Sequence, residues 1–101
     1  MEMKHEDGRF FLEDNDEMIG EITYSAVKDG VISLDHTYVS DSYRGQGLAG
    51  KLLNAALDFA DLKGLKIVPV CEYAKATFER KPEIRFLLAE NYQELLKKGE
   101  N

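Results

Sequence analysis

The glycine-rich turn near the middle of the chain constrains its fold more than any other feature. Val31–Val39 alternates in period two, as expected of a half-buried strand. From Gly47 to Lys63 the apolar residues recur at helical spacing, and Gly64 is a typical residue to end that helix. The chain therefore passes directly from a strand into a long helix, through a turn that leaves backbone N–H groups free.

The remaining segments predict a mixed α/β (α+β) fold. Two further alternating strands, Arg9–Glu13 and Met18–Val27, precede the turn, and Lys28-Asp29-Gly30 is a strong hairpin signal. Three antiparallel strands are thus expected to open the domain. The expected elements after the long helix are a parallel strand at Leu65–Val70, short helices at Tyr73–Arg80 and Glu83–Ala89, and an extension or third helix at Tyr92–Lys98. With 101 residues, we expect one domain spanning residues 1–101.

Composition excludes several classes of function. The formal net charge is −6 and the basic residues are scattered, which argues against nucleic acid as a partner. No apolar run reaches the length of about 18 residues that indicates a membrane span, and the polar N-terminus does not resemble a signal peptide. A single cysteine, Cys71, suits a reducing compartment. We expect a cytoplasmic protein without a bound metal.

The turn has several interpretations. Small residues before a helix N-terminus make an anion site, although a purely structural turn would look the same. Gly45-x-Gly47-x-x-Gly50 matches the dinucleotide fingerprint, but it follows a meander, and residues 51–101 are too few for a second nucleotide-binding half. Gly45-x-x-x-x-Gly50-Lys51 nearly matches a P-loop, yet Leu52 stands where a hydroxyl should hold magnesium.

Arg44-x-x-Gly47-x-Ala49 resembles the Arg/Gln-x-x-Gly-x-Gly/Ala signature of the GNAT superfamily of N-acetyltransferases, which in that family lies between the fourth strand and a long helix. The likeness to the small single-domain GNAT-like proteins covers roughly residues 8 to 90 and includes His36–Val39, Tyr43–Gly45 and Val68–Tyr73. It implies a minimal GNAT-like fold: an antiparallel meander, a long helix, a parallel strand and short C-terminal helices. It also implies acetyl-CoA as co-substrate and an unidentified amine as acceptor.

The resemblance assigns the cofactor contacts residue by residue. Backbone amides of the turn would bind the coenzyme A pyrophosphate, and the strand before the turn would bind the pantetheine arm. The residues so assigned are Tyr38, Val39, Arg44, Gly45, Gln46, Gly47, Leu48, Ala49, Gly50 and Lys51. The chain departs from the family by having Tyr38 where an acidic residue is expected. That departure argues against a general base at this position.

Cys71 and His36 are the candidate catalytic residues. Cys71 ends the strand after the long helix and His36 lies on the neighbouring strand, so both are expected at the gap where these parallel strands diverge. A thiolate activated by histidine can accept an acetyl group, and histidine alone can serve as a base. The structural alternatives are a buried cysteine and a core histidine, because strict alternation puts His36 on one face with Ile32 and Leu34. A β-bulge would re-aim His36.

Two other functions remain open at this level. The helices and strands that build the acceptor site in larger GNAT enzymes have no counterpart in the pattern, which is typical of a non-catalytic coenzyme A-binding module or of a cleft completed by a second copy in a homodimer. A redox-responsive thiol protein would rest on Cys71 alone.

Overall fold

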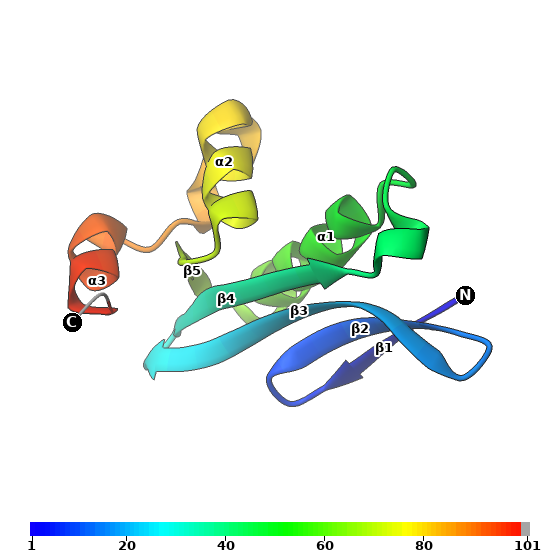
Figure 1. The fold of residues 1–101 in the computed structure, drawn as a ribbon. Coiled ribbons are helices and arrows are strands. Elements are labelled where there is room, and N and C mark those ends of the chain that lie inside the picture. The colour runs from blue at the N-terminus through cyan, green and yellow to red at the C-terminus, as the bar shows by residue number, and fades with distance from the viewer. Residues whose placement is uncertain (100–101) are drawn as a thin grey trace.

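The computed structural model describes residues 1–99 and contains a five-stranded sheet with the strand order β1-β2-β3-β4-β5. The strands are β1 (Glu2–Glu6), β2 (Arg9–Asp14), β3 (Glu17–Lys28), β4 (Val31–Val39) and β5 (Lys66–Pro69). The helices are η1 (Asp41–Tyr43), α1 (Leu48–Lys63), α2 (Glu72–Arg80), η2 (Pro82–Leu87) and α3 (Tyr92–Gly99). Figure 1 shows α1 on one side of the sheet, with α2 and α3 following β5. The predicted mixed fold is confirmed.

β1 is a strand that the pattern did not predict. The meander was expected to have three strands, but Glu2–Glu6 pairs with β2 and makes a fourth antiparallel strand. All five of its residues are exposed, so no apolar alternation marks it. Its side chains pair across the strands instead: Lys4 lies 2.5 Å from Glu13, and the His5 ring stacks on Phe10 with 4.0 Å between ring centroids.

α1 packs its apolar side on the sheet and forms the main core. Leu52 and Leu53 of the helix, with Ile22 and Leu34 of β3 and β4, are almost completely inaccessible to solvent. Gly20 in β3 permits this approach, because a Cβ there would lie 3.2 Å from both Leu52 Cδ1 and the Tyr38 carbonyl oxygen. The helix thereby holds its N-terminus beside the end of β4.

A β-bulge at Asp35 decides which residues of β4 face α1. Thr23 of β3 pairs with His36, but the next residue, Tyr24, pairs with Leu34, so Asp35 is the extra residue. Leu34 is buried and His36 is exposed. The expectation that His36 shares the core face of Leu34 is therefore wrong, and the bulge interpretation is confirmed. Thr37 takes the inward position instead.

Two hydroxyl groups hold this bulge. Ser33 Oγ donates to Asp35 Oδ1 at 2.6 Å, and Ser25 Oγ of β3 donates to Asp35 Oδ2. The carboxylate of the extra residue thus binds both its own strand and the neighbouring strand. Hydrogen bonds from both strands therefore stabilise the bulge.

β5 pairs with β4 in parallel, but only along the first part of β4. The last pair is Leu34 with Pro69, after which the Leu34 carbonyl accepts hydrogen bonds from the N–H groups of Val70 and Cys71. The chain then leaves the sheet and enters α2 as predicted. Beyond Leu34, β5 no longer pairs with β4, and no other strand among residues 1–99 lies beside this edge of β4.

The C-terminal helices differ from expectation in one place. The helix predicted at Glu83–Ala89 is a 3-10 helix at Pro82–Leu87, and Leu88 then forms an isolated parallel bridge with Ile67. Pairing with the sheet therefore replaces the end of the expected helix. α3 is separate and begins at Tyr92. No helix in the described part of the chain is long and apolar enough to span a bilayer.

Candidate functional site

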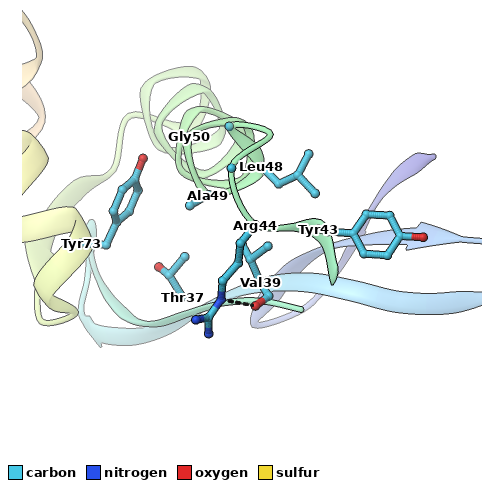
Figure 2. A pocket seen from close by; sticks show the side chains of 10 residues that line it. Thr37, Val39, Tyr43, Arg44, Leu48, Ala49, Gly50 and Tyr73 are labelled. Carbon is cyan, nitrogen blue, oxygen red and sulfur yellow. Dashed lines mark hydrogen bonds between the residues drawn. The ribbon is translucent and has the colours of Figure 1, made fainter. Parts of the chain in front are cut away.

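A pocket of about 430 Å³, here called the turn pocket, opens where β4 ends and α1 begins. It is built from four elements: the end of β4, the glycine-rich turn, the first turn of α1 and the start of α2. Figure 2 shows the Thr37 side chain between Tyr73 on one side and Arg44 and Val39 on the other. Its lining residues are Thr37, Val39, Tyr43, Arg44, Gly45, Gly47, Leu48, Ala49, Gly50 and Tyr73.

The turn presents backbone donors to this pocket. Gly45 and Gly47 have φ angles of 84° and 74°, a left-handed conformation that favours glycine. Among the described residues, no protein acceptor binds the N–H groups from Gly45 to Gly50, and the first turn of α1 contains no acidic side chain. The positive end of the α1 dipole therefore faces the pocket with free donors, which is an arrangement that binds anions.

Two side chains anchor the turn to the sheet. Arg44 Nε donates to the Val39 carbonyl at 3.4 Å, and its Nη2 lies 3.1 Å from Asp41 in an exposed ion pair. Tyr43 donates its hydroxyl to Asp14 Oδ2 at 2.7 Å, and this hydrogen bond, together with burial, raises the pKa of Tyr43. The turn is thus tied both to the end of β4 and to the β2–β3 hairpin.

A second cavity, of about 330 Å³, lies beside the turn pocket and is here called the thiol pocket. It occupies the gap where β4 and β5 stop pairing. Both His36 and Cys71 line it, as expected from their positions on diverging strands. The complete lining is Asp35, His36, Thr37, Val70, Cys71, Glu72 and Tyr73. Thr37 and Tyr73 line both pockets.

Cys71 is the N-cap residue of α2, and the residue is 9% exposed. Its sulfur accepts a hydrogen bond from the Ala74 N–H at 3.3 Å and shares another with Thr37 Oγ1 at 3.2 Å. Within residues 1–99 no hydrogen bond joins Cys71 to His36, so the two share a pocket without direct contact. Cys71 is therefore buried, as the structural alternative predicts, and it also lines a cavity at the gap between β4 and β5.

The predicted cofactor-binding residues divide into two groups. Most of them line the turn pocket, while the side chains of Tyr38, Gln46 and Lys51 do not. Thr37 and Tyr43 were not predicted. An alternating strand without a bulge would have placed Thr37 on the face away from α1, and the bond from Tyr43 to Asp14 joins residues far apart in the chain. No three His, Cys, Asp or Glu side chains among the described residues gather to hold a metal ion.

Comparison with known proteins places these features in a family. A family model described as GCN5-related N-acetyl-transferase matches residues 9–87. Protein NATD1 of Gallus gallus is 36% identical over 66 residues, which cover 65% of this chain and 60% of that protein. For Protein NATD1 of Homo sapiens the identity is also 36%, over 58% of its length. The chain thus matches somewhat under two thirds of these relatives.

Solved structures agree with the family model. A GCN5-like protein of Staphylococcus aureus, solved by NMR, is 34% identical and superposes with a TM-score of 0.72, covering 89% of this chain and 91% of that one. A GNAT family acetyltransferase of Brucella melitensis, crystallised with acetyl-CoA, has the same fold at 21% identity and a TM-score of 0.57, covering 63% of this chain and 46% of that one.

Proposed function

Because this chain belongs to the family of GCN5-related N-acetyltransferases, we propose that it binds acetyl-CoA in the turn pocket and transfers the acetyl group to an amine by way of Cys71. One observation carries the proposal. The pocket at the N-terminus of α1 shares two wall residues, Thr37 and Tyr73, with the pocket that contains Cys71 and His36. In the proposed arrangement, the phosphate site therefore adjoins the nucleophile.

The turn pocket supplies what coenzyme A needs. The free N–H groups between Gly45 and Gly50 would bind the pyrophosphate, and Arg44 adds a cation beside them. The unpaired edge of β4 after Leu34 leaves the Val39 N–H for a pantetheine amide. The backbone groups of Tyr38 face β3 instead, because the Ser40 N–H two residues on donates to the Ile19 carbonyl of β3. A structural neighbour of the same fold was crystallised with acetyl-CoA, which supports this choice of ligand.

The thiol pocket supplies the chemistry. Because the two side chains share a pocket without touching, the Cys71 thiol gives its proton to His36 through a water in the thiol pocket, and the sulfur bonds to the acetyl carbonyl carbon. The bond from that carbon to the coenzyme A sulfur breaks, and the leaving thiolate takes the proton from His36. The amine nitrogen then bonds to the same carbon, the bond to Cys71 breaks, and the amine proton returns to the cysteine. The net products are coenzyme A and an N-acetyl amine.

The test measures binding and covalent transfer separately. Calorimetric titration with coenzyme A should give one site per chain. Incubation with acetyl-CoA followed by intact mass measurement should give one acetyl adduct on the parent and none on Cys71→Ala. Turnover that persists in Cys71→Ala and vanishes in His36→Ala would replace the covalent route by direct transfer to the amine, with His36 as the base.

A second candidate is a coenzyme A-binding module without turnover. One observation favours it: β1 to β4 form an uninterrupted meander, and among residues 1–99 no strand follows β5, so few elements surround the acceptor side of the thiol pocket. This module would bind coenzyme A normally. It would, however, release no free thiol from acetyl-CoA with any amine in a panel of small amines and lysine peptides.

A further inference from the structure

Thr37 lies at the junction of the turn pocket and the thiol pocket. It lines both cavities, and it is half-buried at the inward-facing position that follows the Asp35 bulge. Figure 2 shows its side chain between Tyr73 and Val39. Among the lining residues, Tyr73 is the other one that the two pockets share.

The Cys71 sulfur is held from two sides at this junction. The Ala74 N–H of α2 donates to it at 3.3 Å, and Thr37 Oγ1 of β4 lies 3.2 Å away. The helix contact is an ordinary capping interaction. The contact from the strand is different, because it comes from a residue that also lines the turn pocket.

The bulge is what makes this contact. Before Asp35, the residues of β4 that face α1 are Ile32 and Leu34. Uninterrupted alternation would continue that face with His36, whereas the extra residue puts Thr37 there instead. The strand is thus shaped so that a hydroxyl, and not an imidazole, meets the sulfur.

We propose that Thr37 is the positioning residue of the Cys71 thiol: its hydroxyl holds the sulfur at the junction of the two pockets and donates to it in the thiolate form. A thiolate can only accept, so the hydroxyl must then be the donor. The inference rests on the proposed function insofar as it gives Cys71 a reacting role. The contact itself does not depend on any ligand.

Alkylation of Cys71 by iodoacetamide tests the inference, because the thiolate is the reacting form and no coenzyme is needed. The rate is followed by intact mass across a range of pH. Thr37→Val keeps the shape of the side chain and loses the hydroxyl. At neutral pH its Cys71 should be alkylated about tenfold more slowly, which is the usual effect of losing a hydrogen bond to a charged group. The curve of alkylation rate against pH should move to higher pH. Thr37→Ser should restore the parent rate.

Thr77→Val is the matched control. Thr77 is buried in α2 and its hydroxyl donates to the Tyr73 carbonyl at 2.9 Å without touching the sulfur. Thr77→Val loses a hydrogen bond comparable to the one lost in Thr37→Val, but the Cys71 sulfur keeps both of its contacts. We therefore expect an alkylation rate of Cys71 within about twofold of the parent rate. If Thr37→Val does not fold, Thr37→Ala against Thr37→Ser makes the same comparison.

Parent-like alkylation of Thr37→Val, or a Thr37→Ser as slow as Thr37→Val, would overturn the inference. A failure of the proposed function looks different. In that case Cys71 takes no acetyl group from acetyl-CoA in any variant, while the alkylation rates still separate Thr37→Val from Thr37→Ser.

Discussion

Cys71 stands at a helix position where an oxygen-bearing side chain is normally found. N-cap residues are preferentially Ser, Thr, Asp or Asn, because a side-chain oxygen is a strong acceptor for the free N–H groups of the first turn. A thiol is a weaker acceptor, yet here it caps α2 and also meets Thr37. Capping alone therefore gives no reason for sulfur at this position, whereas the proposed role as a nucleophile would.

Cys71→Ser and Cys71→Ala should differ in stability in a defined order. The serine hydroxyl keeps the bond to the Ala74 N–H, so we expect Cys71→Ser to be at least as stable as the parent. Cys71→Ala loses the cap and should unfold with a free energy about 1 kcal/mol below that of Cys71→Ser. Urea denaturation measures both. An alanine variant more stable than the serine variant would contradict the capping role.

Gly47→Glu should abolish coenzyme A binding, because the new carboxylate would stand among the free N–H groups at the start of α1. The change also strains a residue with φ of 74°, so Gly30→Glu is the control. Gly30 has φ of 78° in the β3–β4 hairpin, lies outside both pockets and has open space around its missing Cβ. Calorimetry should find binding in Gly30→Glu only. Equal affinities in the two variants would argue against the turn as the phosphate site.

At the scale of elements, the site depends on where β4 stops being regular. Its first part is paired on both sides, with β3 and with β5, and is fully buried. After the bulge at Asp35 it loses β5 and opens to two pockets. One end of β4 therefore belongs to the core, and the other end is an unpaired edge beside two pockets.

Asp35→Ala should weaken the β-bulge in β4. It removes the acceptor for Ser25 and for the buried Ser33 hydroxyl, so we expect a loss of about 1–2 kcal/mol in the free energy of unfolding. Acetyl transfer should fall more than stability alone explains, since His36 and Thr37 lose their fixed orientation. Asp58→Ala, at an exposed position of α1, is the control for losing one acidic charge. Unchanged turnover in Asp35→Ala would show that the bulge does not need its carboxylate.

Tyr43 should make the anchoring of η1 sensitive to alkaline pH. Its hydrogen bond to Asp14 raises the pKa of Tyr43 above the ordinary value of 10.0. A raised pKa in the folded state means that the contribution to stability is complete below pH 10.0 and is lost as the pH rises through the folded pKa. Tyr43→Phe should lack this part of the pH dependence. Ultraviolet titration of the tyrosines, with Tyr43→Phe for subtraction, measures the shift, and a Tyr43 that ionises like a free tyrosine would contradict it.

At the scale of the whole molecule, the two pockets lie where segments distant in the chain converge. β4, the start of α1 and α2 meet there, and Tyr43 ties the turn to the β2–β3 hairpin. The β3–β4 hairpin lies at the opposite end of β4 (Figure 1). A ligand in the turn pocket would therefore link elements that are otherwise joined mainly through the core. Such a ligand should stabilise the fold as a unit.

Coenzyme A should accordingly raise the melting temperature. At a ligand concentration about 100 times the dissociation constant, binding adds about 2.7 kcal/mol, which corresponds to roughly 10–20 °C for a domain of this size. Differential scanning calorimetry at several ligand concentrations measures the rise, and Gly47→Glu should show none. A melting temperature independent of coenzyme A would remove both proposed functions together.

Periodicity and glycine placement by themselves determined most of the fold and the position of the turn. The hydrophobic pattern of a half-buried strand or helix is local, so β2 to β5, α1 and the end of α1 at Gly64 all follow from neighbouring residues. The resemblance carried by Arg44 to Ala49 led to the family. The same pattern cannot mark β1, because an exposed edge strand buries no apolar face.

Tertiary structure alone decided the register and therefore the site. Asp35 becomes an extra residue only through the pairing of β4 with β3, and hydroxyl groups of both strands bind its carboxylate. The bulge turns Thr37 inward to Cys71 and His36 outward. The period-two pattern of β4 predicts the opposite orientation of these two residues. Local sequence thus determined which residues stand near the gap, and long-range pairing decided which of them touch.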